Sequence, residues 1–91
     1  MKITLRQLQV FVAIATQGHA SRAADTIGMT QSAASMALAD LERQLGSQLF
    51  NRAGRQLRLN DLGRQLLGQA VEVLDRVAAI DSKSGRIGIV L

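Results

Sequence analysis

The sequence predicts a mainly α-helical fold: three helices and a small β-hairpin, followed by one long helix. Two observations predict it. Apolar residues recur at helical spacing along most of the chain, and over residues 48–60 the spacing changes to alternation. In addition, 47% of the 91 residues are hydrophobic but just two, Phe11 and Phe50, are aromatic, which suits helices that pack closely through Leu, Val, Ile and Ala. A chain of this length forms one small domain.

The composition excludes several classes of protein. The chain has no cysteine, so disulfides and cysteine-based zinc sites are ruled out, and a cytoplasmic location is expected. No apolar run is long enough to span a bilayer. The first residues, MKITLRQLQVFVAIAT, weakly imitate a signal peptide. However, Arg6, Gln7 and Gln9 interrupt the run at helical spacing, which favours an amphipathic helix.

Basic charge is concentrated in the first 60 residues. They carry seven Lys or Arg and three Asp or Glu, a net charge of +4, whereas residues 61–91 carry four of each and are neutral. A basic region of this kind favours a polyanionic partner, with nucleic acid ahead of a membrane surface.

The first helix is predicted over residues 5–17. Thr4 and Gln7 have the spacing of a capping box, and Gly18 is suited to end the helix in a left-handed conformation. The apolar stripe of this helix is expected in the core; it consists of Leu5, Leu8, Phe11, Val12 and Ala15.

Residues 20–40 have the pattern of a helix-turn-helix. Ser21 is the predicted N-cap of a short second helix, and Thr30 is the predicted N-cap of a third helix that ends at Gly46. The three residues GMT between them contain Gly28, as such turns often do. The third helix should bury Ala34, Leu38, Leu41 and Leu45. Its first turns instead carry small or uncharged side chains, which leave a slim face for close approach to a partner: Gln31, Ser32, Ala33, Ser35 and Met36.

A hairpin is predicted after the third helix, with strands at residues 49–51 and 56–59 and a turn at Ala53 and Gly54. A hairpin of this size is not stable alone, so it must pack on the helices. It carries three arginines and no acidic residue: Arg52, Arg55 and Arg58.

The long helix is predicted over residues 61–81, with Asn60 as its N-cap. It has two apolar stripes, and a single chain can cover one of them with its first helix, so the second stripe favours a partner helix. Gly63 and Gly68 lower its helix propensity, and close approach of another backbone is a plausible reason for them. After it, residues 82–91 are predicted to form a flexible joint and then a strand from Ile87 to Leu91, the first strand of a further domain.

These features together resemble the N-terminal domain of LysR-type transcriptional regulators. The resemblance covers residues 3–80, and it rests on the order and spacing of four fragments: LRQLQVFVAIATQG, SRAADTIGMTQSAAS, LADLERQLGSQLFNR and RLNDLG. It implies a winged helix-turn-helix over residues 1–60, with the wing at about 48–60. It further implies that residues 61–81 are a linker helix for dimerisation, and that residues 82–91 are a hinge and the first strand of an effector-binding domain.

The resemblance also implies the partners. Such regulators bind double-stranded DNA as dimers at interrupted inverted repeats, in the bacterial nucleoid, and RNA polymerase is a possible partner of the full-length protein. No cofactor is expected in this segment, because a small-molecule coinducer binds the C-terminal domain of these proteins.

Matching the family motif residue by residue gives the expected contacts. Gln31 matches the residue that reaches base edges, and Ser32 and Ser35 lie on the same leading face. Ser21 and Arg22 fall where phosphate contacts are usual, and Arg52 and Arg55 match basic positions of the wing. Met36 and Ala39 replace residues that are often cationic, which predicts that this helix contacts bases more than it forms ionic contacts with phosphates.

The complete predicted DNA-binding set is Ser21, Arg22, Thr30, Gln31, Ser32, Ser35, Met36, Ala39, Arg52 and Arg55. The predicted dimerisation set is Leu66, Leu67, Ala70, Val71, Val73, Leu74, Val77 and Ala78.

Other functions are less consistent with the sequence. The chain could be a protein-interaction module whose long helix pairs with another protein, the basic region being incidental. A membrane-surface helix is disfavoured because Glu72, Asp75 and Asp81 make its polar face acidic. Catalysis is not expected, because the sequence has no nucleophile elbow and no phosphate-binding glycine loop. The single histidine, His19, is interpreted as a surface turn residue and not as a metal ligand.

Overall fold

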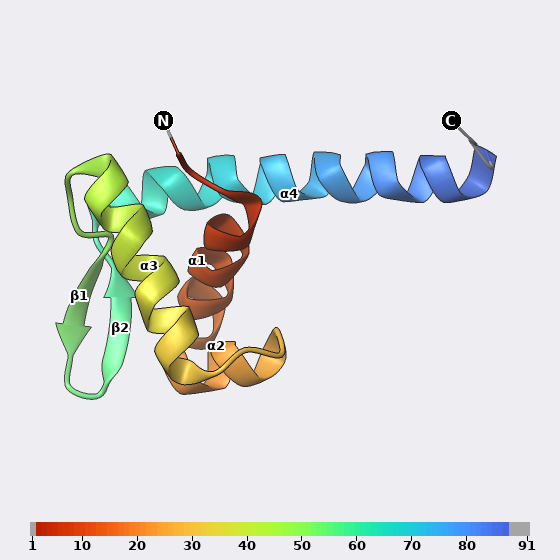
Figure 1. Cartoon of the computed structure of the whole chain (residues 1–91). Coiled ribbons are helices and arrows are strands. Elements are labelled where there is room, and N and C mark those ends of the chain that lie inside the picture. Colours follow the sequence, from red (N-terminus) through yellow and green to blue (C-terminus); the bar gives the residue numbers. More distant parts are fainter. Residues whose placement is uncertain (1, 88–91) are drawn as a thin grey trace.

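The computed structural model describes the backbone of residues 2–87 and the side chains as far as residue 81. Its elements confirm the predicted fold class: α1 (Leu5–Gln17), α2 (Ala20–Thr26), α3 (Gln31–Leu45), β1 (Phe50–Ala53), β2 (Gln56–Leu59) and α4 (Asp61–Ile87). Figure 1 shows α1 behind α3, the hairpin beside α3, and α4 running across the end of α1 and projecting past the other elements. The molecule therefore consists of a compact head and a protruding shaft.

Helix α1 lies at the centre of the head. Its predicted capping box is present: the Thr4 Oγ1 accepts from the Gln7 N–H at 3.1 Å, and the Gln7 Oε1 accepts from the Thr4 N–H at 3.1 Å. Its buried residues differ in part from the predicted stripe. Leu5 of that stripe is 44% exposed, whereas Val10 and Ile14, which lie outside it, are fully buried. The reason is that α2, α3 and α4 all pack on α1, so apolar residues are buried on more than one side of it.

Helices α2 and α3 form the predicted helix-turn-helix, with one correction. The residue at the N-cap of α2 is His19, which makes no capping bond with its side chain, so the prediction of Ser21 as N-cap is wrong. The Gly18 carbonyl accepts from the Leu57 N–H at 2.9 Å, and this bond fixes the chain direction just before Ala20. The other boundaries are confirmed: Thr30 caps α3 through the Ala33 N–H at 3.1 Å, and α3 ends at Gly46.

The hairpin pairs β1 and β2 in antiparallel register from Phe50 opposite Leu59 to Ala53 opposite Gln56. Its turn is therefore Gly54–Arg55 and not Ala53–Gly54. The φ of Gly54 is 64°, and Gly54 is followed by a residue with negative φ, which is the pattern of a type II′ turn. The strand also begins later than the predicted residue 49, because the Leu49 N–H donates to the Glu42 side chain.

The hairpin packs on the helices through the two aromatic rings. Phe50 from β1 contacts Phe11 from α1, with ring centroids 5.6 Å apart and a tilt of 57°. The core around this pair is made of aliphatic side chains from every helix and from the segment just before β1: Leu8, Val10, Ile14, Ala23, Ala24, Ala34, Leu41, Leu49 and Ala70.

Asn60 joins the hairpin to α4. Its Oδ1 accepts from the Gly63 N–H at 2.8 Å, which confirms it as the N-cap, and its Nδ2 donates to the Gln48 carbonyl at 2.8 Å. A Cβ on Gly63 would lie 2.2 Å from the Leu49 carbonyl oxygen, so the expected close approach of a backbone is confirmed at this glycine. At Gly68 it is not, since a Cβ there would meet no atom within 4 Å.

Helix α4 is longer than predicted. It continues to Ile87, so the joint expected from residue 82 is absent at that point and no strand begins at Ile87. Extending an existing helix gains a hydrogen bond for each residue added, and the segment contains no proline to stop it. Residues 88–91 of the predicted strand lie outside the described residues. Among the helices that the structure describes, none is long and apolar enough to cross a membrane.

Candidate nucleic-acid interface

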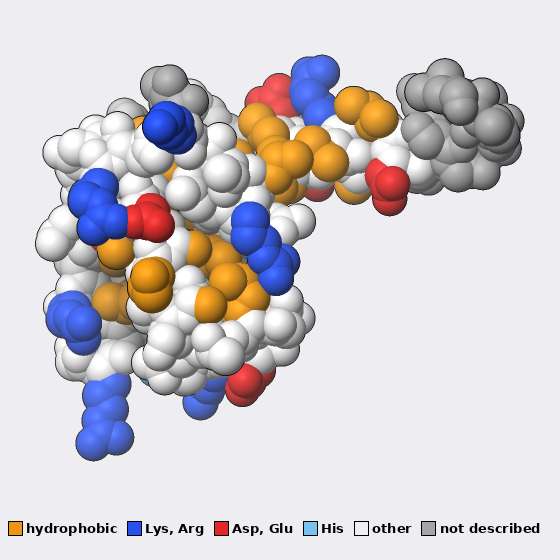
Figure 2. All heavy atoms as spheres, viewed as in Figure 1, with side chains coloured by type: hydrophobic (Ala, Val, Ile, Leu, Met, Phe, Trp, Pro, Cys, Tyr) orange, Lys and Arg blue, Asp and Glu red, His pale blue; other side chains and the backbone are white. Residues whose placement is uncertain are grey.

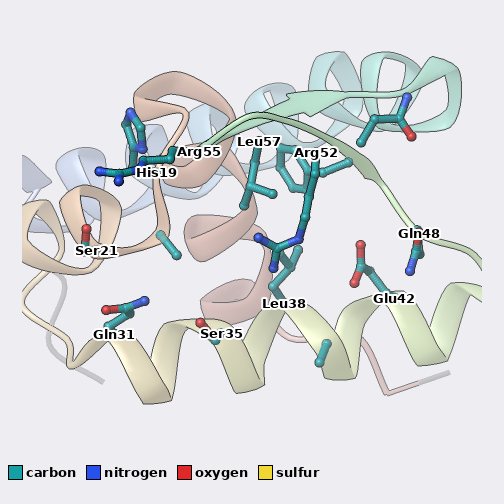
Figure 3. A pocket seen from close by; sticks show the side chains of 14 residues that line it. His19, Ser21, Gln31, Ser35, Leu38, Glu42, Gln48, Arg52, Arg55 and Leu57 are labelled. Atoms are coloured by element: carbon teal, nitrogen blue, oxygen red, sulfur yellow. The ribbon is translucent and has the colours of Figure 1, made fainter.

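A groove of about 590 Å³ lies between α3 and the hairpin. Figure 3 shows α3 along one side, β1 along the other, and the side chains of both elements pointing into the space between them. The start of α2 closes one end of the groove, because Gly18 is bonded to β2 immediately before this helix. The groove therefore depends on the packing of three separate segments. Its lining includes six of the ten residues predicted to bind DNA: Ser21, Gln31, Ser35, Ala39, Arg52 and Arg55.

The other four predicted residues lie outside the groove. Ser32 and Met36 are on the outer side of α3, one helical position beyond the groove-lining residues Gln31 and Ser35. Met36 is 67% exposed. Thr30 uses its hydroxyl to cap α3, and Arg22 is exposed on α2. Helix α3 thus presents two adjacent rows of side chains: one row faces the groove, and the outer row, with Ser32 and Met36, faces away from it.

The two groove arginines extend in different directions. In Figure 3 the Arg52 side chain reaches from β1 toward α3, above Leu38, whereas Arg55 extends toward the end of the groove that holds His19 and Ser21. Ion pairs within 4.0 Å among the described side chains join Arg43 to Asp40, Arg64 to Asp61 and Arg76 to Glu72. Neither groove arginine is in this set, so their charges are available to an external anion.

The groove contains residues that the sequence analysis missed. His19, Gln48 and Asn51 lie in its lining, and so does Glu42. Helical spacing was a signal for Glu42, since residues 31, 35, 38 and 42 share one side of α3. The other three depend on how the hairpin and the α1–α2 turn fold against α3, and no local pattern indicates that.

Basic side chains are spread around the head of the molecule. Figure 2 shows Lys and Arg side chains along the edge where the hairpin and α3 lie, and also at the top, bottom and opposite side of the head. Glu42 is the one acidic residue among the described groove-lining residues. In the part of the chain that the structure describes, no cluster of three or more His, Cys, Asp or Glu could hold a metal ion.

A second exposed surface lies on the shaft. Ala70 is buried against the head and is part of the core of the chain, so its assignment to a dimer interface is wrong for this chain. Leu66, Leu67 and Leu74 are partly buried on the same core. From residue 71 onward four large apolar side chains of α4 are exposed: Val71 at 38%, Val73 at 39%, Val77 at 38% and Ile80 at 64%. Figure 2 shows a continuous band of hydrophobic side chains on α4 where it leaves the head.

Comparison with known proteins places this architecture among bacterial regulators. Residues 5–64 match the model of the bacterial regulatory helix-turn-helix protein, lysR family. The uncharacterized HTH-type transcriptional regulator YeiE of Escherichia coli is 44% identical over 81 residues, which are 89% of this chain and 28% of that protein. The chain thus spans about 28% of the length of this relative.

Two solved structures are similar over the whole domain. The crystal structure of a BenM DBD complex with benA site 1 DNA has a TM-score of 0.85 and 30% identity, covering 93% of this chain and 96% of that one. The crystal structure of a CbnR DBD–DNA complex has a TM-score of 0.83 and 27% identity, covering 94% and 99%.

Proposed function

Since the chain belongs to the lysR family of bacterial regulatory helix-turn-helix proteins, we propose that it binds specific double-stranded DNA as a homodimer and thereby regulates transcription. The observation that carries this proposal is the groove, which brings Gln31 and Ser35 of α3 opposite Arg52 and Arg55 of the hairpin. Base-reading and phosphate-binding side chains thus converge on one surface. The solved DNA complexes of two similar domains support the same assignment.

Helix α3 is proposed to enter the major groove of the DNA. A major groove about 12 Å wide accepts a helix whose leading face is slim, and the exposed front of α3 carries serine and alanine side chains. Gln31, in the first turn of α3, has an amide that can pair bidentately with an adenine edge. Met36, exposed on the outer row, suits apolar contact with a thymine methyl group.

The hairpin is proposed to act as the wing. Arg52 points from β1 toward α3, which suits a phosphate of the strand that passes between helix and wing. Arg55 stands in the turn, where it can reach groove edges and read their width. Unpaired arginines supply affinity that is independent of sequence and decreases with salt.

The homodimer is proposed to form through α4. Val73, Val77 and Ile80 lie within about 60° of one another around the shaft, and a second copy of the same helix offers a surface of matching chemistry. Two copies related by a two-fold axis present two grooves in opposite directions. This arrangement fits an interrupted inverted repeat.

The remaining roles concern regions beyond this chain, which spans only 28% of the length of the YeiE regulator. We propose that a small-molecule coinducer binds outside this segment and that RNA polymerase is contacted at the promoter. Both roles place the protein at the bacterial nucleoid, in the cytoplasm.

The test is DNA binding by fluorescence anisotropy over a series of salt concentrations, on sites selected from random DNA. Wild type should bind with a strongly negative slope of log affinity against log salt. Arg52→Ala should reduce that slope by about one unit. Arg76→Ala, which removes an arginine from the shaft, is the matched control and should leave the slope unchanged. Absence of salt-dependent binding by the wild type would refute the proposal and favour a protein-interaction module.

A further inference from the structure

Glu42 is an unexpected residue in a groove that is proposed to bind the phosphates of DNA. It is the one acid among the described residues that line the groove, and its charge repels the DNA backbone that we propose to bind there. An acidic side chain at this position lowers affinity unless it contributes something that offsets the repulsion. Its contacts show what it contributes.

The Glu42 side chain bonds α3 to the segment that leads into the wing. Its Oε2 accepts from the Leu49 N–H at 2.8 Å, and its backbone carbonyl accepts from the Ser47 N–H at 3.1 Å. Leu49 is fully buried and immediately precedes β1. Because a buried N–H needs a partner and a carboxylate is a strong acceptor, this bond is difficult to replace with water.

The position of Arg52 follows from this bond. Arg52 is three residues after Leu49 on β1 and extends across the groove toward α3, in the same space as the Glu42 carboxylate (Figure 3). The two side chains do not form one of the ion pairs within 4.0 Å among the described residues. Glu42 therefore leaves the guanidinium free while it fixes the strand that carries it.

We propose that Glu42 is a positioning residue for DNA binding. Its carboxylate holds the segment before β1 against the last turn of α3. This bond sets the separation of the wing from α3, so that Arg52 reaches a phosphate of the DNA backbone. The proposal rests on the proposed function, because it concerns how the same groove binds DNA.

Two substitutions separate the hydrogen bond from the charge. Glu42→Gln removes the charge but keeps an oxygen of the same reach, so it should bind DNA at least as tightly as wild type. Glu42→Asp keeps the charge but shortens the side chain by one methylene, and it should lose about tenfold in affinity because the bond to Leu49 is broken. A purely electrostatic role leaves the affinity of Glu42→Asp unchanged, and that result would overturn the proposal.

A double-mutant cycle tests whether Glu42 acts through Arg52. Glu42→Asp should cost about tenfold in the wild-type background and less than about twofold in the Arg52→Ala background. Equal losses in both backgrounds overturn the proposal. Asp40→Ala removes an acid from the same helix that is paired with Arg43 and not with the wing, so it should show no coupling to Arg52.

A third measurement needs no DNA. Amide hydrogen exchange of Leu49, followed by NMR in the free protein, should be faster in Glu42→Asp and as slow as wild type in Glu42→Gln. Unchanged exchange in Glu42→Asp contradicts the inferred bond.

The two proposals fail in different ways: if the inference alone is wrong, wild type still binds DNA and Arg52→Ala still weakens binding. If the proposed function is wrong, wild type itself does not bind and the inference fails with it.

Discussion

The groove and the shaft are both exposed, but they expose opposite chemistry. The groove is polar and basic, and its walls are held within one chain by the bonds from Leu57 to Gly18 and from Leu49 to Glu42. The shaft exposes Val73, Val77 and Ile80, and α1 covers only the part of α4 near Ala70. The two surfaces therefore suit different partners: the groove is formed within one chain and suits an anion, whereas the exposed face of the shaft suits a second apolar surface.

The largest expected effect comes from Gly63, at the joint between the two regions. Gly63→Ala puts a Cβ 2.2 Å from the Leu49 carbonyl oxygen, and because backbone must move to make room, the free energy of unfolding should decrease by about 2–3 kcal/mol. Urea denaturation followed by circular dichroism measures it. Gly68→Ala is the matched control on the same helix. Its Cβ meets nothing within 4 Å, so it should stabilise the protein by about 1 kcal/mol.

The next effect should separate association from folding. Val77→Glu places a charge in the exposed apolar face and should weaken the dimer by about 2 kcal/mol, or about thirtyfold in its dissociation constant. Ala79→Glu makes the same charge change two residues away, at an exposed position about 200° around the helix from Val77. It should leave the dissociation constant unchanged. Sedimentation equilibrium measures both, and equal weakening by the two variants would place the interface elsewhere.

A smaller effect is confined to the groove. Gln31→Ala should reduce affinity for a selected site by about tenfold, because one bidentate contact with a base is lost. Affinity for random DNA should change little, since Gln31 carries no charge. Competition binding with both DNAs measures the ratio. Equal losses on the two DNAs would mean that Gln31 does not read a base, and a loss in dimer affinity would contradict the separation of groove from shaft.

The smallest effect concerns the outer row of α3. If Met36 contacts a thymine methyl group, replacing that thymine by deoxyuridine should weaken wild-type binding by about 0.8 kcal/mol, a factor of about four. Met36→Ala should bind both DNAs equally. Scanning the selected site one thymine at a time measures the effect. A Met36→Ala variant that remains sensitive to the methyl group shows that another side chain makes the contact.

The sequence predicted the local structure well where local chemistry decides it. Thr4 with Gln7, Thr30, Gly46 and Asn60 each satisfy backbone groups of their own helix end, so their signatures identified the ends. Ser21 has the same signature and was misleading. The start of α2 is decided by a bond between Gly18 and Leu57, residues far apart in the sequence that the fold brings together.

The groove was only partly predictable for the same reason. Gln31 and Ser35 follow from the helical spacing of α3, and Arg52 and Arg55 from the lack of acidic residues in the hairpin. That these two pairs line opposite sides of one groove depends on the packing of Phe50 on Phe11. Likewise, two apolar stripes on α4 were visible in the sequence. The sequence could not show that the head covers part of each stripe, with Ala70 of one stripe buried and Leu67 and Leu74 of the other partly buried, while Val77 and Ile80 stay exposed.

Asn60 and Gly63 have a consequence for the geometry of an assembled pair. With its N-cap bonded to the Gln48 loop and its first turn pressed against the Leu49 backbone, α4 leaves the head in one direction. Along the helix, each residue is rotated by about 100° and displaced by about 1.5 Å relative to the residue before it. In the proposed dimer, inserting one residue between Ala70 and Val73 should turn the two heads out of phase with the DNA helix while leaving each groove intact. The number of residues between the joint and the apolar face should then set the spacing of the half-sites that the dimer recognises.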